Sequence, residues 1–228
     1  MSLRILLSNF ARTSREKGYR AAVRAVRERI VERHFESHFD IETRGVITPL
    51  ELGFATADSH SYVATSYTDI FRMLRRLAPT PADVLLDYGC GKGRALVVAA
   101  TFPFSQAIGV ELSEPLVEEA RRNLQLAARR FRCPRVEVWQ GSAADYRVPD
   151  EVTIAYFNNP FSGGVLAQVL DRLRASLARR PRALRLACTL PPDSAFERTL
   201  EATPDIVAHD SAKHTDSDTH QRIFQLCA

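Results

Sequence analysis

The residues best suited to chemistry form a glycine-rich loop after an apolar segment. Asp87 ends the apolar run VLLD, and Gly89, Gly91 and Gly93 follow at alternate positions. Glycines at a strand-to-helix turn let the backbone turn tightly and approach a ligand that a Cβ would exclude. A dinucleotide loop has the spacing GxGxxG and seats a diphosphate, whereas this loop is GxGxG after an acid. The carboxylate of Asp87 therefore favours a cationic ligand over a diphosphate.

A second acid ends another apolar run, AIGVE. This residue, Glu111, lies eighteen positions beyond Gly93. An acid at the end of the second strand of such a fold can accept hydrogen bonds from both hydroxyls of a ribose. The two acids and the glycine spacing together predict a cofactor site. An ordinary strand-to-helix turn and a nicotinamide-dependent dehydrogenase remain the alternatives.

A third polar group, Asn158-Asn159-Pro160-Phe161, follows the apolar run VTIAYF. A side-chain amide and backbone carbonyls at a strand end could accept hydrogen bonds from an attacking amine, while Phe161 would wall the site. Catalysis would then depend on proximity and orientation, and it would need no general base if the amine arrives neutral. The alternative is a plain turn at the end of a strand.

These segments resemble the class I S-adenosylmethionine-dependent methyltransferase family over about residues 62 to 190. The shared features are DYGCGKGR at 87–94, Glu111, the run Gly141-Ser142-Ala143, and the run from Asn158 to Phe161. The resemblance implies an enzyme with S-adenosylmethionine as cofactor and S-adenosylhomocysteine as product.

The family pattern assigns the cofactor contacts residue by residue. It implies that Asp87 orders the methionine end and that the loop through Tyr88, Gly89 and Gly91 passes beneath the cofactor. It also implies that Glu111 holds the ribose.

The same pattern assigns the adenine side of the site. Ser142 and Ala143 stand where the family often has Asp-Ala beside the adenine. The serine departs from that pattern, and the nearby Asp145 could supply the acid instead.

Upstream, Tyr62-Val63-Ala64-Thr65 looks like the Tyr-Val-Pro-Thr entry segment of a family subset, several of whose members methylate protein lysines. Ala64 replaces the proline. By that analogy, Tyr62 and Thr65 would close over the methionine carboxylate.

The Asn-Asn-Pro-Phe run is similar to two motifs of amino-group methyltransferases. One is Asn-Pro-Pro-Phe/Tyr, from which Asn159 departs, and the other is the Asn-Asn run of non-SET histone-lysine methyltransferases, from which Pro160 departs. The resemblance implies Asn158 and Asn159 as catalytic residues, Asn158 also as a cofactor contact, and a nitrogen acceptor such as a protein lysine. A small-molecule O- or N-methyltransferase, a nucleic-acid base methyltransferase and a non-catalytic adenosyl-binding module are the alternatives.

The elements that must position these residues follow from hydrophobic periodicity. Helices are expected over 15–35, where Tyr19, Val23, Val26, Ile30 and Val31 would form an apolar face packed beside the core, and over 66–77. From residue 83 onward, apolar runs alternate with helical stretches, and two C-terminal strands form a hairpin. We therefore expect a Rossmann-like α/β fold with a seven-stranded, mostly parallel sheet, helices on both faces and an antiparallel C-terminal hairpin. Residues 1–60 are expected to be an N-terminal helical cap and loop, and residues 61–228 the methyltransferase domain.

Composition limits the partners. The chain of 228 residues has 31 Lys and Arg against 27 Asp and Glu, a mild basic excess that disfavours a dedicated nucleic-acid binder. Its four cysteines are widely separated, which favours a reducing cytoplasm over a disulfide framework or a zinc site. No apolar run is long enough for a membrane span. The expected acceptor is therefore a protein or a small molecule. The N-terminal helix, if it is not a cap, could mediate a homodimer.

Histidines offer no metal site by their spacing. His209, His214 and His220 are expected in a solvated hairpin loop, and His34 and His38 lack a third ligand. We therefore predict no metal.

Overall fold

A computed structural model describes residues 11–16, 18–48, 62–212 and 219–227. A seven-stranded sheet with the order β5-β4-β3-β6-β7-β9-β8 crosses the molecule. Its strands are β3 (Val84–Tyr88), β4 (Gln106–Glu111), β5 (Val136–Gln140), β6 (Ile154–Phe157), β7 (Leu184–Leu190), β8 (Ile206–Ala212) and β9 (His220–Leu226). Strands β3 to β7 pair in parallel, and β9 is antiparallel to both β7 and β8. This order confirms the predicted mostly parallel sheet and its antiparallel C-terminal hairpin.

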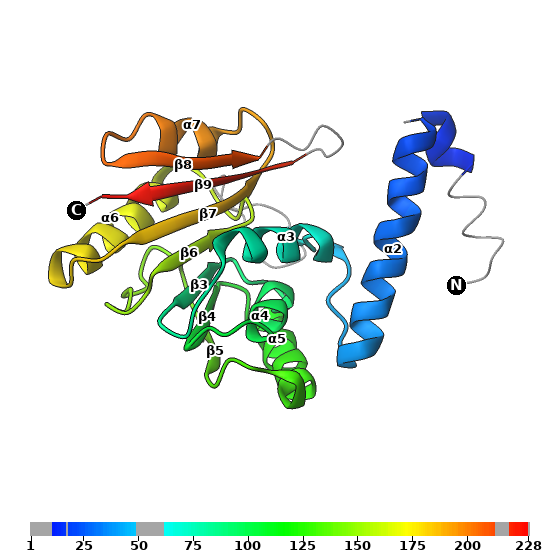
Figure 1. Ribbon diagram of the computed structural model, residues 1–228, viewed down its shortest axis with the longest axis horizontal. Helices are drawn as coiled ribbons and strands as arrows, with labels where there is room; N and C mark the ends of the chain where they lie inside the picture. The colour runs from blue at the N-terminus through cyan, green and yellow to red at the C-terminus, as the bar shows by residue number, and fades with distance from the viewer. Residues whose placement is uncertain (1–10, 17, 49–61, 213–218, 228) are drawn as a thin grey trace.

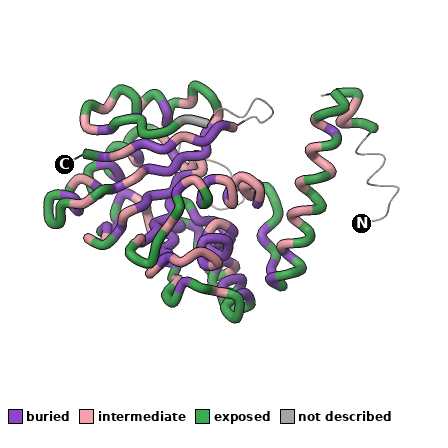
Figure 2. The backbone as a smooth tube through the Cα atoms, viewed as in Figure 1, coloured by how far each residue is buried: buried purple, intermediate pink, exposed green. Residues whose placement is uncertain are grey.

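Helices cover both faces of this sheet (Figure 1). On one face lie α3 (Tyr67–Leu77), α4 (Arg94–Ala100) and α5 (Glu114–Ala127), followed by the short helix η1 (Ala128–Arg130). On the other face lie α6 (Gly163–Arg179) and α7 (Ala195–Glu201). Two separate apolar cores result, one on each face, and Figure 2 shows the buried residues concentrated along the central strands.

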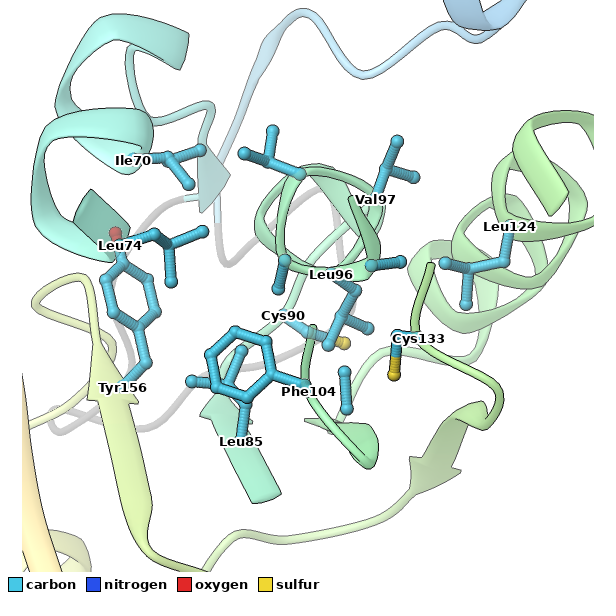
Figure 3. Close-up of a cluster of buried hydrophobic side chains, with 14 of the residues drawn as sticks. Ile70, Leu74, Leu85, Cys90, Leu96, Val97, Phe104, Leu124, Cys133 and Tyr156 are labelled. Atoms are coloured by element: carbon cyan, nitrogen blue, oxygen red, sulfur yellow. The ribbon is translucent and has the colours of Figure 1, made fainter. Parts of the chain in front are cut away.

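The first core joins the glycine loop to its neighbours. Figure 3 shows Cys90 of the loop beside Leu96 of α4, above Leu85 of β3. The thiol of Cys90 occupies the space that a side chain at position 109 would need, because a Cβ on Gly109 would lie 2.6 Å from Cys90 Sγ. The cysteine between the two loop glycines is therefore an anchor in the core.

Helix α3 begins where the sequence predicts it. Ser66 is its N-cap, and the Ser66 hydroxyl accepts a hydrogen bond from the Asp69 amide at 3.4 Å. Ile70, Met73 and Leu74 are buried against the sheet. The apolar period of the helix and its serine cap therefore agree, and the prediction for 66–77 is confirmed.

The N-terminal helix forms, but its predicted apolar face is wrong at Tyr19, Val23 and Ile30. Helix α2 spans Tyr19–Phe39, and the side chains of Tyr19, Val23 and Ile30 are 68%, 44% and 60% exposed. Figure 1 shows that α2 stands beside the sheet domain, and in Figure 2 most of it is exposed or intermediate. Only its C-terminal part reaches the first core, through Val31 of the predicted face and through Phe35 and Phe39. A polar face, described below, makes the remaining attachment, so apolar periodicity did not identify the docked surface.

Two short strands connect α2 to α3. Strand β1 (Val46–Ile47) pairs antiparallel with β2 (Tyr62–Val63). The loop expected at the end of residues 1–60 therefore contains a short strand, and residues 49–61 lie outside the described part of the chain.

The histidine prediction is wrong for His220. This residue begins β9, is 8% exposed, and places Nε2 2.9 Å from Glu197 Oε2 of α7. His209 is exposed on β8, and His214 lies outside the described residues.

Among the helices that the structure describes, none has the length and apolar character to cross a bilayer.

Candidate active site

The predicted site residues follow the ends of four adjacent strands. Asp87 lies on β3, Glu111 on β4, Ser142 after β5 and Asn158 after β6. These strands are parallel neighbours in the order β5-β4-β3-β6, so their carboxyl ends share one edge of the sheet. In open α/β sheets, ligands bind outside the carboxyl ends of the strands, where the strand order reverses. The fold therefore gathers at one edge residues that lie up to 71 positions apart.

Backbone hydrogen bonds fix the glycine loop against β4. The amides of Gly89 and Cys90 both donate to the carbonyl of Val110, at 2.8 and 3.1 Å. Gly89 and Gly91 have φ angles of +73° and +54°, in the left-handed region that favours glycine. The loop therefore needs glycine for its conformation.

Gly89 also brings the asparagine run against the glycine loop. A Cβ at position 89 would lie 2.7 Å from Pro160 Cβ, closer than two carbons can approach. The absence of a side chain at Gly89 lets Pro160 pack directly on the loop. The residues after β6 therefore lie beside the residues after β3.

We expect Gly89→Ala to destabilise the protein by about 2 kcal/mol, from backbone strain and overpacking. A matched control is Gly18→Ala, because Gly18 also has a positive φ, +86°, yet a Cβ there would meet nothing within 4 Å. Urea unfolding of both variants measures the difference. Equal losses for the two variants would show that the contact with Pro160 contributes nothing.

Glu111 is held by two backbone amides. Its Oε2 accepts from Gly91 N and its Oε1 from Ser113 N, both at 2.9 Å. Burial raises the pKa of Glu111, and these two hydrogen bonds oppose that rise. The carboxylate is therefore fixed beside the loop, and each of its oxygens retains a lone pair for a ligand hydroxyl.

Asp87 is the least satisfied acid of the site. Its side chain is 2% exposed, and its Oδ2 has no hydrogen-bond partner within the described part of the chain. Burial, followed by repulsion from Glu111, raises the pKa of Asp87 to about 8. A buried carboxyl without a partner costs stability unless a ligand satisfies it. The position therefore suits a bound cation or hydrogen-bond donor.

The segment after β5 turns at the same edge. The Ser142 hydroxyl accepts from the Ala144 amide at 3.3 Å, and the Ser142 carbonyl accepts from the Asp145 amide at 2.9 Å. Ser142 and Ala143 are half-buried, and Asp145 is exposed. The serine hydroxyl thus stabilises the turn itself.

Aromatic rings form the wall behind the asparagine run. Tyr88 and Phe157 stack at 5.1 Å between centroids, and Phe161 contacts both edge-on at 6.2 and 6.3 Å. Because the Tyr88 ring is buried in the second core, only its backbone lies in the loop. Asn158 and Asn159 are half-buried, and Asn159 has a φ of +46°. Both asparagines are therefore partly exposed directly after β6.

The entry segment reaches the site through its backbone. The carbonyl of Thr65 accepts a hydrogen bond from Arg94 Nη1 at 2.8 Å. The backbone of Tyr62 pairs with Ile47, and its side chain lies outside the described part of the structure. Arg94 therefore connects the segment before α3 to the first residue of α4.

Arg94 is the centre of a buried network that sequence reasoning missed. It is 4% exposed and donates to Thr43 Oγ1 at 2.7 Å, to Glu32 Oε1 at 2.7 Å and to Glu36 Oε1 at 3.3 Å. Its guanidinium also lies 4.4 Å from the centroid of the Tyr67 ring. One arginine therefore links α2, the segment after α2, and α3 to the end of the glycine loop.

A second set of bonds reinforces this attachment. The side chain of Asn123 donates to the carbonyls of Glu42 and Lys92, and it accepts from the amide of Glu42 at 3.2 Å. Ser66 donates to Glu28 Oε2 at 2.6 Å. The signal for this docking face was the spacing of Glu28, Glu32 and Glu36, which puts three carboxylates on one stripe of the helix.

Comparison with known families matches residues 85–180 to a family model described as a methyltransferase domain. The match begins at Leu85 in β3 and includes the glycine loop and the asparagine run.

A curated relative, a protein-lysine N-methyltransferase from Saccharolobus islandicus, is 35% identical over 65 residues. That alignment covers 28% of this chain and spans 40% of the relative's length.

Solved structures share the fold at low identity. An RNA methyltransferase from Salinibacter ruber in complex with S-adenosyl-L-homocysteine has a TM-score of 0.51 at 20% identity, covering 72% of this chain and 94% of that one. A tRNA (uracil-54, C5)-methyltransferase from Pyrococcus abyssi, also in complex with S-adenosyl-L-homocysteine, has a TM-score of 0.53 at 17% identity, covering 72% and 39%.

Proposed function

We propose that this chain, which carries a methyltransferase domain over residues 85–180, is a class I S-adenosylmethionine-dependent methyltransferase that methylates a nitrogen acceptor, such as the side chain of a protein lysine. The observation that carries this proposal is the contact of Pro160 with Gly89, which sets two half-buried asparagines, Asn158 and Asn159, beside the glycine loop. The relative's name, protein-lysine N-methyltransferase, supports the acceptor class.

S-adenosylmethionine, the cofactor of the family, fits the groups at this edge. The buried, unpartnered Oδ2 of Asp87 requires a donor or a cation, and the methionine end carries an ammonium group. Glu111, fixed by Gly91 N and Ser113 N, has lone pairs left for ribose hydroxyls. Thr65 and Tyr62 would cover the methionine carboxylate, and Ser142, Ala143 and Asp145 would border the adenine.

The bound cofactor supplies an electrophilic methyl group, and the chain's own residues orient the acceptor. The side-chain amide oxygen of Asn158 and the carbonyls of the run would accept hydrogen bonds from the amine. Phe161 is 7% exposed and packs against Phe157, which gives the site a rigid apolar wall. Catalysis of this kind depends on holding the amine in line with the methyl group. It requires that the amine arrive neutral.

Transfer of labelled methyl groups tests the proposal. The full chain is incubated with S-adenosylmethionine carrying a tritiated methyl group and with separate pools of protein, RNA and small metabolites. We expect label in protein, recovered as methyl-lysine after acid hydrolysis. Asn158→Ala should reduce the rate by about 100-fold, because a misaligned acceptor loses about that factor.

The control for this variant is cofactor affinity, measured by calorimetry with S-adenosylhomocysteine. The rate should fall more than the affinity, because Asn158 acts chiefly on the acceptor. Label in the RNA or metabolite pool alone would overturn the protein acceptor. Binding of NAD without binding of S-adenosylmethionine would contradict the cofactor.

A further inference from the structure

A groove between α2 and α3 has no role in the site described above. Its lining consists of basic and apolar side chains around a hollow of about 570 Å³, namely Arg27, Val31, Phe35, Thr68, Phe71, Arg72, Arg75 and Arg76. Figure 1 shows the two helices that form its walls at the edge of the sheet domain. The groove uses a different face of α2 from the one that carries Glu28, Glu32 and Glu36 to the Arg94 network. The docking of α2 therefore creates the groove without filling it.

The charge of the groove is positive and only partly neutralised. Arg72 pairs with Asp69, and Arg76 pairs with Asp210, both at 2.6 Å. Arg27 and Arg75 are exposed and have no ion pair among the residues that the structure describes. Arg27 lies on one wall and Arg75 on the other, so both sides of the groove present a guanidinium group. The complementary ligand is anionic.

The floor of the groove distinguishes between anionic ligands. Single-stranded nucleic acids bind by stacking bases on open aromatic faces. Here Phe35 lies between Tyr67 and Phe71, at 5.1 and 4.8 Å, and Arg75 lies 6.0 Å from the Phe71 centroid. The ring faces therefore already have partners. What remains is an apolar floor with carboxylate-binding walls, which suits alternating apolar and acidic side chains.

The length of the groove suits a short peptide segment. Arg27 and Phe35 are eight residues apart on α2, which corresponds to about 12 Å along the helix. An extended peptide covers that length with about four residues. Thr68 lines the groove and lies three residues beyond Thr65, whose carbonyl accepts a hydrogen bond from Arg94 at the end of the glycine loop. A peptide bound there would be tethered close to the segment that enters the active site.

We propose that the groove between α2 and α3 binds an acidic, partly apolar peptide segment of the protein that is methylated. This inference rests on the proposed protein acceptor. It assigns to α2 the recognition of acceptor residues that flank the methylated amine.

Fluorescence anisotropy on the full chain tests the groove directly. The probe is a fluorescein-labelled peptide in which Glu and Leu alternate, and a second peptide with Lys in place of Glu controls for charge. We expect the acidic peptide to bind, with an affinity that falls as salt is added, and the basic peptide not to bind. Reversing both unpaired arginines, in Arg27→Glu with Arg75→Glu, should weaken binding roughly tenfold or more.

The matched control reverses two exposed arginines near η1, in Arg129→Glu with Arg132→Glu, and should leave binding unchanged. Equal losses in the two double variants, or no binding of the acidic peptide, would overturn the proposal. Stronger binding of a single-stranded oligouridylate that displaces the peptide would also overturn it, in favour of RNA.

The methylation assay separates this inference from the proposed function. If the acidic peptide binds but no label appears in protein, the proposed protein acceptor is contradicted, and peptide binding by the groove is not. If the Arg27→Glu with Arg75→Glu variant labels protein as fast as the wild type, the proposed role of the groove in acceptor recognition is contradicted, and the proposed function is not.

Discussion

Asp87→Asn should weaken binding of S-adenosylhomocysteine by about 10- to 100-fold at about pH 8.5, because it removes a charge-assisted hydrogen bond. The same variant should be at least as stable as the wild type at that pH. Asp87 is buried without a partner in the described structure, so its ionised form costs the folded chain free energy that the amide does not. A loss of affinity together with unchanged or greater stability would identify Asp87 as a ligand-binding group.

The pH dependence follows from the raised pKa of Asp87, about 8 against an ordinary value of 3.8. Between those values the folded chain holds a proton that the unfolded chain has released, so the contribution of Asp87 to stability falls as the pH rises through this window. Affinity should change in the opposite direction, because the ligand binds the ionised form. We expect affinity to rise by up to roughly tenfold per pH unit between about pH 6 and about pH 8 and then to level off.

Calorimetry of wild type and Asp87→Asn across this range measures the effect. Titration of the ligand's own groups affects its binding to both proteins equally, so it cancels in the ratio of the two affinities. A ratio that is constant with pH would contradict the role of Asp87, whatever the absolute affinities.

Arg94→Met should destabilise the protein by about 3–5 kcal/mol, the usual cost of removing one partner from a buried ion pair. The variant leaves Glu36, 5% exposed, without its buried guanidinium, and it removes the donors to Thr43 and Thr65. Because these bonds attach α2 and the segment before α3 to the glycine loop, cofactor affinity should fall as well. Urea unfolding and calorimetry measure the two effects.

Arg44→Met is the matched control, since Arg44 also pairs with Glu36, at 2.7 Å, but its side chain is 53% exposed. An exposed pair contributes at most about 1 kcal/mol. Replacing Glu36 by Gln in the Arg94→Met protein should recover part of the lost stability, because the unpaired charge disappears. If Arg44→Met and Arg94→Met cost the same, the Arg94 network has no special role.

The sheet and much of the candidate site were predictable because their signals are local. Apolar runs that alternate with helical stretches predict parallel strands with crossover helices, and the structure has both. The acids and asparagines are each adjacent to such a run in the sequence. Since parallel strands align their carboxyl ends, finding the strands also locates Asp87, Glu111 and Asn158 at one edge.

The apolar pattern of the sequence did not indicate how α2 is attached. The spacing of its apolar residues predicted a face that the structure leaves exposed at Tyr19 and Ile30. The helix instead docks through Glu32 and Glu36, whose partner Arg94 lies 62 and 58 residues away. Periodicity reports which side of a helix is apolar, but it carries no information about a distant cation that can satisfy buried carboxylates.

The α/β class, the mostly parallel sheet and the places of the polar residues after its strands follow from the sequence alone, because hydrophobic period and glycine spacing act within a few residues. The burial of His220, the contact of Pro160 with Gly89 and the Arg94 network arise only in the folded chain. Each of these depends on side chains that become neighbours after the chain has folded. Burial then sets their charge and hydrogen bonding, as the raised pKa of Asp87 illustrates.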